Sequence, residues 1–495
     1  MEQRGENRSQ AVDAIQYESM EEAPQSQLKA ARPAASRVRD GLSVGLALAA
    51  GLGLRLWMLG HLYEVTGDAQ VYGELAKNLL RRGQYAQSLA TGALHPTLIR
   101  LPGFPLLLAA CFRVFGMENY ASVTWVAIAL ELVGCLLLAD CARRIAPPVL
   151  ARGAAHATLW LGVLCPFTAS YAALPLTETP TLFVLALALW AAARFRNKPE
   201  WGSALWFTLA VTYAALLRPD GALAAVALAP ALLVGLPKGS GTPTTGKLAR
   251  MALVCTLLAL TPFAVWTARN WRVFHVFQPL APRSAADPGD PTHPGFDDWV
   301  KTWCLDFVST YDIYWNVPQG PLEMDKLPSR AFDSPAQYAQ TAALVADYNA
   351  GQVLTQALDA RFEQLARERV AAHPFRSRLW LPLGRVADMT LRPRVENLPI
   401  DLDWWVYARH YSETRFSWAW AGLNGLYLAL GVAGLCLRPR MWGAMLAYFL
   451  LRSALLATIE APEARYTLEY FPMLFVLGGV AAAGVVARVS SARCN

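Results

Sequence analysis

The sequence predicts an all-α integral membrane protein, and its composition, hydropathy and charge placement support this prediction. Of the 495 residues, 55% are hydrophobic and only 16% are charged, whereas a soluble chain carries about 25% charged residues. The apolar residues fall in long blocks, as in helices that cross a bilayer. The net charge of +7 comes from Lys and Arg clustered in short segments between these blocks. This distribution indicates membrane orientation and argues against a basic, aromatic nucleic-acid-binding face.

The cysteines and the N-terminal residues narrow the protein class further. Nearly all of the eight cysteines lie in or beside apolar blocks, without CxxC or paired Cys/His spacing. They predict neither a disulfide framework nor a zinc site. Residues 1–40 are polar and poor in aromatic residues, which predicts a disordered cytoplasmic arm. A cleavable signal peptide would place its apolar stretch nearer the start, so the first apolar block is expected to remain as an anchor.

Eleven apolar blocks lie along the chain, and the charges between them indicate that the second does not cross the membrane. If 101–117 stays outside, every basic connection between the later blocks lies in the cytoplasm, as the positive-inside rule favours. This block is also short and opens with two prolines, as interfacial or re-entrant segments often do. About ten spans are therefore expected. The blocks are 41–60, 101–117, 121–140, 153–174, 180–193, 203–217, 221–236, 249–267, 415–437, 441–458 and 467–487.

The non-cytoplasmic side then holds a first loop of roughly 61–120 and a long segment of roughly 268–414. The long segment is too polar for membrane and too long for a plain loop. From about 334 to 372 it shows a helical apolar face, with Asp333 or Ser334 as the cap and Pro374 as the end. The predicted parts are a cytoplasmic arm (1–40), a transmembrane module with the first outer loop (41–280), an extracytoplasmic helical domain (281–414), C-terminal transmembrane helices (415–487) and a cytoplasmic tail (488–495).

The first outer loop carries the earliest candidate site residues. The sequence of residues 67–85, GDAQVYGELAKNLLRRGQY, predicts a surface helix that begins at Asp68, contains Tyr72 and stops at Gly83. Asp favours the N-cap, so a capping role for Asp68 stands beside a role as a general base. His95 and Arg100 follow in HPTLIRLPGFP. Anchoring to lipid phosphate is the alternative role for Arg100.

Further candidates lie at the outer ends of the later spans. For Glu178 and Arg218, structural roles are the alternative, because a helix N-terminus tolerates Glu well and a tight turn favours Pro and Gly. The positive-inside rule does not account for the arginines on the outer side, which favours a functional role for Arg269, Arg272 and Arg465. The planar donors of an arginine also match the oxygens of a phosphate. The candidates are Glu178 in ALPLTETP, Arg218 in RPDG, Arg269 and Arg272 in ARNWRVF, and Arg465 and Tyr466 in EARYTLEYFP.

Two charged residues, Glu131 and Arg452, lie inside apolar blocks. Charges at membrane depth are costly, so they are functional candidates by default. These two could also pair with each other as a structural lock. We favour the structural interpretation.

Together these motifs resemble the polyprenyl-phosphate-sugar glycosyltransferases of the GT-C fold, and are similar to protein O-mannosyltransferases and lipid A aminoarabinose transferases. The resemblance rests on the order and common side of GDAQVY after the first span, RLPGFPLLLA, the TET turn after ASYAALPL, LRPDG, RNWRVF and EARYTLEYFP. It covers most of 41–280 and 415–487, whereas 283–413 matches no motif.

The resemblance implies a GT-C-like helical bundle that moves a sugar from a polyprenyl-phosphate donor to a hydroxyl acceptor on a lipid, glycan or protein, with inversion. Asp68 would be the catalytic base and Glu178 the second acidic residue. Ala69 stands where many relatives carry an acid, so the resemblance implies no cofactor firmly: it leaves a divalent metal open, but the ligand spacing here does not support one. The predicted substrate-binding residues are Tyr72, His95, Arg100, Arg218, Arg269, Arg272, Arg465 and Tyr466.

The implied location is a bacterial inner membrane, with the site facing the extracytoplasmic side and membrane lipids, not nucleic acid, as partners. A lipid or polysaccharide transporter or flippase without transferase activity is the main alternative. Such a protein predicts internal repeats and midplane charges, and only Glu131 and Arg452 suit it. A non-catalytic partner in an envelope assembly is a third alternative, which free replacement of Asp68 would favour.

Overall fold

The computed structural model describes residues 39–233, 244–318 and 320–492, which are mostly helical. The predicted arm up to residue 38 and the end of the predicted tail, 493–495, lie outside the described residues. The chain divides into two compact units, 1–51 and 52–495. Residues 39–51 are helical, and the packing and the sites described below belong to the second unit.

Among the described residues, six helices are long and apolar enough to cross a membrane. They are Arg39–Leu62, Tyr120–Ile145, Glu178–Asn197, Thr245–Phe274, Tyr411–Cys436 and Ala464–Ser490. The shorter apolar helices are Gly103–Phe115, Trp201–Leu217, Pro219–Leu233 and Trp442–Leu456. These helices confirm the predicted all-α membrane fold.

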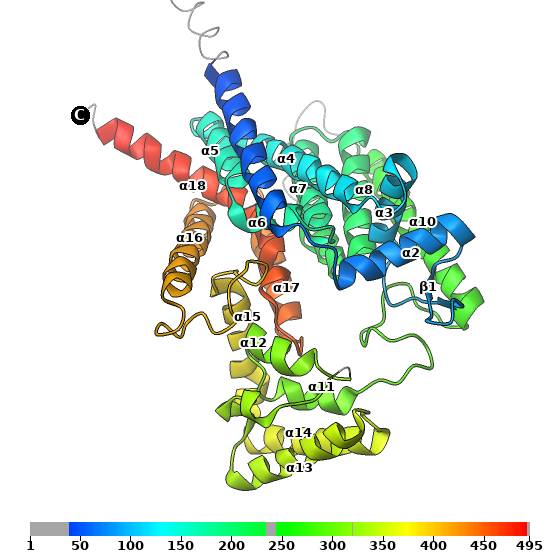
Figure 1. The fold of residues 1–495 in the computed structure, drawn as a ribbon. Coiled ribbons are helices and arrows are strands. Elements are labelled where there is room, and N and C mark those ends of the chain that lie inside the picture. The colour runs from blue at the N-terminus through cyan, green and yellow to red at the C-terminus, as the bar shows by residue number, and fades with distance from the viewer. Residues whose placement is uncertain (1–38, 234–243, 319, 493–495) are drawn as a thin grey trace, which may run out of the picture. The chain divides into compact units, whose positions relative to one another are not determined.

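The membrane helices pack around two central elements, α7 (Glu178–Asn197) and α18 (Phe471–Ala492). The helix α7 contacts α4 (Tyr120–Ile145) and α8 (Trp201–Leu217), while α18 contacts α5 (Ala151–Val163) and α16 (Tyr411–Cys436) (Figure 1). The helix α9 (Ala222–Leu233) packs on α17 (Trp442–Leu456). The most apolar window of α7 is 83% buried by protein, whereas that of α10 (Thr245–Phe274) is 6% buried. An apolar helix that protein leaves uncovered is expected to face lipid.

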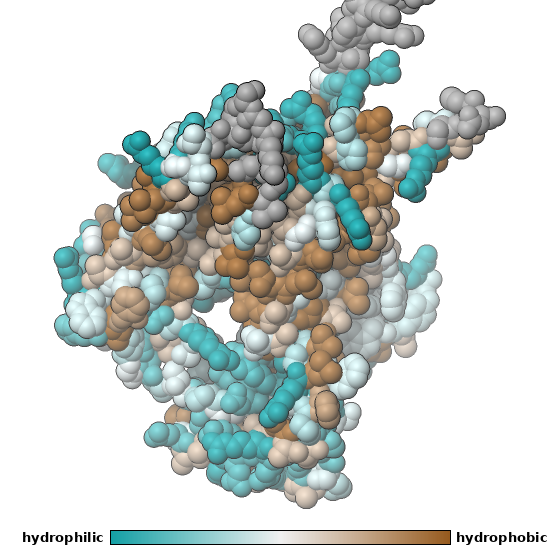
Figure 2. Space-filling model, turned by 180° about the vertical axis from the view of Figure 1, so that it is seen from behind, coloured by the Kyte–Doolittle hydropathy of each residue, from teal (hydrophilic) through white to brown (hydrophobic). Residues whose placement is uncertain are grey.

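Hydropathy divides the surface of this unit. On the face drawn in Figure 2, hydrophobic side chains form a broad band across the membrane-helix part of the view, with hydrophilic ones above this band and over the lower part. The lower part holds α11 (Pro294–Lys301), α13 (Pro335–Gly351) and α14 (Gln356–Ala372) (Figure 1). That this segment lies outside the bilayer stays a prediction.

The first outer loop folds on the membrane helices. Its helix α2 (Asp68–Arg82) packs on α3 (Gly103–Phe115), and between them β1 (Ala86–Ser88) pairs antiparallel with β2 (Leu94–Pro96). The helix α2 ends where predicted, because Gly83 adopts a left-handed φ of 66° and its N–H bonds Leu79 O. With 13 residues, α3 is about 20 Å long, too short for a hydrocarbon core of about 30 Å.

Two predicted helices are each divided in the structure. The block 153–174 forms α5 and α6 (Pro166–Ala172), with the break directly before Pro166. The stretch 334–372 forms α13 and α14, whose N-caps are Ser334 and Thr355. Each cap side chain accepts a backbone N–H, from Gln337 and Leu358 respectively.

The outer segment has a hydrophobic core of its own. Aromatic residues of α11 and α14, including Phe296, Trp299 and Phe362, pack against one another and against Tyr348 of α13. This core includes Cys304, which is fully buried. The remaining helical elements of the chain are α12 (Phe307–Ser309), α15 (Leu381–Leu391), the 3-10 turns Pro219–Gly221, Met324–Lys326, Ser329–Ala331 and Ala464–Tyr470, and the π-turns Thr310–Tyr314 and Arg376–Trp380.

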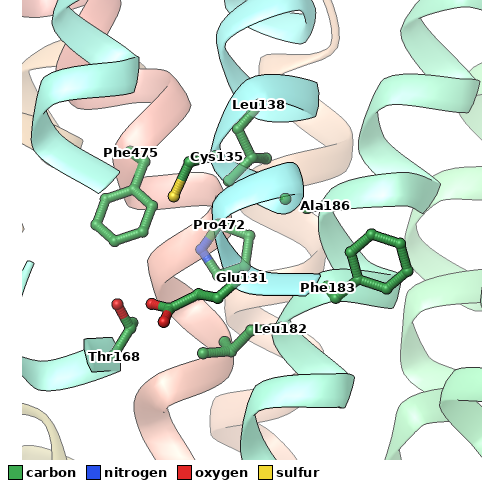
Figure 3. A pocket seen from close by; sticks show the side chains of 10 residues that line it. Glu131, Cys135, Leu138, Thr168, Leu182, Phe183, Ala186, Pro472 and Phe475 are labelled. Atoms are coloured by element: carbon green, nitrogen blue, oxygen red, sulfur yellow. The ribbon is translucent and has the colours of Figure 1, made fainter. Parts of the chain in front are cut away.

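Glu131 and Arg452, which the sequence left as a possible pair, have different partners in the structure. Glu131 of α4 accepts a hydrogen bond from Arg55 Nε at 2.7 Å, and Arg55 also donates to Val163 O at 2.7 Å. Arg55 therefore fastens its helix to α4 and to the end of α5. Figure 3 shows the Glu131 carboxylate directed toward Thr168, in a pocket that Cys135 and Phe475 also line.

The topology can be checked by reporter fusions at 118, 145, 197 and 439. We expect an outside signal at 118 and inside signals at the other three, because the basic connections are then cytoplasmic. An inside signal at 118 together with outside signals at 145, 197 and 439 would contradict the assignment of α3 as a non-spanning helix. Labelling of Cys304 is unsuitable for this purpose, since the folded domain buries it.

Candidate functional site

Acidic and basic side chains from separate elements meet where α2, α7, α8 and α18 begin or end. We call this set the acid–arginine cluster. It joins residues that are hundreds of positions apart in the sequence, through ion pairs at 4 Å or less. Its members are Asp68, Arg100, Glu178, Arg218, Asp220, Arg452, Glu463, Arg465 and Glu469.

Asp68 is the first residue of α2, and its carboxylate faces two arginines. The N-cap of α2 is Gly67, and no side-chain capping bond forms there. Instead, Arg100 Nη2 donates to Asp68 Oδ1 at 2.7 Å, and Arg465 Nη1 lies 3.5 Å from Oδ2. The side chain is 28% exposed. The capping role is therefore not what holds Asp68, although a carboxylate in the first helical turn is still electrostatically favourable.

Arg465 lies between the two predicted acidic site residues. Its Nη1 is 3.5 Å from Asp68 and 3.6 Å from Glu178. Its Nε is 2.6 Å from Glu463, and the Tyr466 hydroxyl donates to the same Glu463 carboxylate. Glu463 thus orients both Arg465 and Tyr466.

Arg218 forms the next layer inward, in the turn that follows α8. Its guanidinium approaches Asp220 at 3.2 Å, Glu469 at 3.4 Å and Glu178 at 3.7 Å, and lies over the Tyr466 ring. Burial opposes its charge, but these carboxylates raise the pKa of Arg218 well above its usual value. A Cβ atom at Gly221 would lie 2.2 Å from Ala214 O, so the predicted RPDG turn requires glycine there.

Arg452 lies deepest and is fully buried. It donates to Asp220 Oδ2 at 3.0 Å and to Tyr466 O at 2.9 Å, and it pairs with Glu469. Arg452, whose partner the sequence left open, therefore belongs to the base of the cluster. Its contact with Tyr466 O fixes the turn that carries Arg465.

Exposure decides which arginines an incoming ligand can reach. The exposed fractions of the side chains are 32% for Arg100, 22% for Arg465, 16% for Arg218 and zero for Arg452. Among the described residues, nothing accepts a hydrogen bond from the buried Arg100 Nε. Tyr72 lies beneath the Arg100 guanidinium, and burial raises the pKa of its phenol. Arg100 and Arg465 are therefore the arginines of the cluster that a ligand can reach most easily.

Three predicted site residues lie elsewhere. Arg269 donates to Thr97 O at 2.8 Å and to Tyr85 O at 2.7 Å, so it fastens the chain on both sides of the β1–β2 hairpin. His95 Nε2 lies 3.7 Å from Asp287 Oδ2. Arg272 is exposed, and no described contact joins it to the cluster. A direct role for these residues in substrate binding stays a prediction.

Metal binding is a separate question. Within the described ranges, two sets of His and carboxylate groups are close enough to share an ion: His95 with Asp287 and Asp290, and Asp401 with His410 and Glu413. Neither set includes Asp68 or Glu178.

Three acidic members of the cluster are absent from the sequence-based candidates: Asp220, Glu463 and Glu469. A signal for Glu469 exists, because it falls inside the apolar block 467–487 and an acid in such a block is a functional candidate. Asp220 belongs to the RPDG turn, where turn chemistry alone accounts for it. Its role becomes visible only when Arg452 is placed beside it.

Comparisons with known proteins match this chain to glycosyltransferases. Residues 95–267 match the family model described as dolichyl-phosphate-mannose-protein mannosyltransferase. A comparison with curated proteins found no match.

Solved structures also resemble the chain. AglB from Archaeoglobus fulgidus, an archaeal oligosaccharyltransferase in complex with an inhibitory peptide and a dolichol-phosphate, is 12% identical with a TM-score of 0.48, over 93% of this chain and 52% of that chain. ArnT from Cupriavidus metallidurans, bound to undecaprenyl phosphate, is 16% identical with a TM-score of 0.37, over 90% of this chain and 78% of that chain. The chain thus spans about half the length of the oligosaccharyltransferase.

The family match bears directly on the cluster. The matched range, residues 95–267, contains Arg100, Glu178 and Arg218, whereas Asp68 and Arg465 lie outside it. The resemblance predicted from the sequence motifs is confirmed: residues 95–267 of this chain match the dolichyl-phosphate-mannose-protein mannosyltransferase family.

Proposed function

We propose that this protein is a membrane glycosyltransferase that moves one sugar from a polyprenyl-phosphate donor to a hydroxyl acceptor, with inversion at the anomeric carbon. The observation that carries the proposal is the partly exposed Asp68 carboxylate between the two accessible arginines, Arg100 and Arg465. A carboxylate can take a proton from an attacking hydroxyl, and arginines can hold a phosphate. Both needs of the reaction are met within one cluster.

In the proposed reaction, the acceptor oxygen attacks the anomeric carbon as its proton passes to Asp68. The bond from that carbon to the phosphate oxygen breaks, and the polyprenyl phosphate leaves with the bonding electron pair. The Arg465 guanidinium stabilises the charge that grows on the leaving phosphate. The partly exposed Arg100 guanidinium offers further donors for the same anion.

Glu178 has a positioning role in this proposal. It is buried, and its carboxylate touches Arg218 at 3.7 Å and Arg465 at 3.6 Å. Such contacts hold the two guanidinium groups at a fixed spacing. The outer domain that we propose for 281–414 would then select the acceptor, and the site would face the extracytoplasmic side of a bacterial inner membrane.

The purified protein in detergent tests the proposal. Polyprenyl phosphates that carry different single sugars would be supplied with a membrane extract as the acceptor source, and free polyprenyl phosphate would be measured. We expect release from at least one lipid-phosphate sugar and none from nucleotide sugars. Masses of lipid-linked sugars and surface glycans with and without the gene would then identify the product. Unchanged glycans together with no donor consumption would reject the transferase proposal.

Substitution of Arg465 tests how the donor binds. Loss of a hydrogen-bonded pair with a charged group costs about 1.5–3 kcal/mol, so Arg465→Ala should raise the KM for the lipid-phosphate sugar roughly tenfold or more. The matched variant is Arg269→Ala, also an arginine beside the first outer loop. Because its donors bond carbonyl oxygens of Thr97 and Tyr85, we expect it to weaken the loop more than donor binding. An unchanged KM in Arg465→Ala would remove Arg465 from the donor site.

A further inference from the structure

A second group of titratable side chains lies apart from the acid–arginine cluster, in the segment that leads from α15 into α16. It contains Asp401 and Asp403, and His410 and Glu413 follow at the start of α16. None of these residues contacts a member of the acid–arginine cluster in any described ion pair. The group therefore needs an explanation of its own.

The two nitrogens of His410 differ in their surroundings. Nε2 lies 2.9 Å from Asp403 Oδ1, an ordinary hydrogen-bond distance. Nδ1 lies 3.4 Å from Asp401 Oδ2 and 3.7 Å from Glu413 Oε1, which is too long for such a bond. The carboxylates on the Nδ1 side are near the nitrogen without being bonded to it.

This arrangement leaves a lone pair among negative charges. A neutral imidazole carries one N–H, and the bond to Asp403 uses it. With the proton on Nε2, the Nδ1 lone pair faces two carboxylates, and a cation between these three groups would stabilise the arrangement. Around a tetrahedral zinc ion, with metal–ligand distances of about 2.0–2.2 Å, neighbouring ligand atoms lie roughly 3.4 Å apart. The distances from Nδ1 are close to that spacing.

We propose that Asp401, His410 and Glu413 form a binding site for a divalent cation of the Zn²⁺ class. One ligand atom from each lies within 4.8 Å of the other two. Asp403 orients the imidazole through Nε2, as a carboxylate commonly does behind a metal-bound histidine. The second Glu413 oxygen accepts the Asp401 N–H at 3.0 Å, which fixes the two carboxylates relative to each other.

The ion would fasten an aromatic segment to a membrane helix. Between the two ends of the site lie Trp404, Trp405 and Tyr407, and Trp404 packs edge-on against Trp418 of α16 at 6.2 Å. Tryptophan and tyrosine favour the membrane–water interface. The site would therefore hold this interfacial segment at the start of α16, independently of the sugar-transfer reaction.

The test uses the full-length protein, stripped by a chelator and titrated with Co²⁺ and then Zn²⁺. Visible absorption reports the Co²⁺ coordination, and mass spectrometry of dialysed samples gives the Zn²⁺ stoichiometry. We expect one tightly bound equivalent, with an affinity that falls at least about tenfold in His410→Gln and in Glu413→Gln. Asp403→Asn should keep the stoichiometry at saturation but weaken binding by roughly 10–100-fold, the usual effect of removing a partner behind a metal ligand.

The matched control is His95→Gln, which alters the other set of His and carboxylate groups. It should leave the binding described above unchanged. Loss of the bound equivalent in His95→Gln with retention in His410→Gln would overturn the proposal. So would the absence of binding by the wild-type protein. Circular dichroism of each variant shows that it is folded when its binding is measured.

Discussion

Asp68→Asn should lower the rate of sugar transfer at least about a hundredfold, because general acid–base catalysis typically contributes 10²–10⁴-fold. The amide can still accept a hydrogen bond from Arg100, so the site should stay assembled. A loss of helix capping would not explain a lower rate, because the N-cap of α2 is Gly67 and no side-chain capping bond forms there. The measurement is the transfer rate at saturating donor, with protein level and donor binding followed separately.

Two variants sharpen this prediction. Asp68→Glu keeps the charge but moves the oxygens by a methylene, so it should also be slow. Glu64→Gln makes the same acid-to-amide change four residues earlier, at an exposed position, and should transfer sugar normally. A wild-type rate in purified Asp68→Asn would show that another group takes the acceptor proton.

Most of the membrane fold was predictable, because hydropathy and charge act over whole segments. Long apolar blocks became helices, and Gly83 stopped α2 as its sequence context predicts. The errors lie at single residues. Pro166 interrupts the apolar block 153–174, which predicts a single helix, because proline has no N–H to donate to the preceding helical turn. Thr355 begins a second helix within a stretch of continuous helical apolar periodicity, because its hydroxyl accepts the Leu358 N–H and caps the new helix.

The site was predictable as a region but not as a set of partners. The sequence places many charged residues on the predicted outer surface, and the structure brings together Asp68, Arg100, Glu178, Arg218 and Arg465. Arg269 has the same local signal as these arginines, yet it bonds carbonyl oxygens of the first outer loop. A charged side chain near the surface can form hydrogen bonds with backbone carbonyl oxygens or with another side chain. Tertiary packing decides which of these partners it has.

Arg452 illustrates the same limit and leads to the second large effect that we expect. The sequence marks it as a costly membrane charge but leaves its partner open. In the structure its partners are Asp220 and Glu469, at the base of the acid–arginine cluster. Removing one member of a buried ion pair leaves an uncompensated charge, at a cost of about 3–5 kcal/mol.

Arg452→Met should therefore lower the melting temperature in detergent substantially and abolish most transfer. The activity should fall because Arg452 also donates to Tyr466 O at 2.9 Å, beside Arg465. The double variant Arg452→Met/Glu469→Gln removes one charge of each sign and leaves Asp220 with Arg218. It should recover much of the lost stability, because a neutral pair avoids the desolvation of an unpaired carboxylate.

The double variant should not recover activity to the same extent, since the turn that carries Arg465 still lacks its anchor. This difference between stability and activity separates a positioning role for Arg452 from a purely structural one. The comparison variant is Arg367→Met, which removes an exposed arginine paired with Glu363 and should change neither property. If Arg452→Met melted like the wild type and kept its transfer rate, the buried ion pairs would not be what holds Arg465 beside Asp68. Full activity in the double variant, with its stability restored, would assign Arg452 to stability alone.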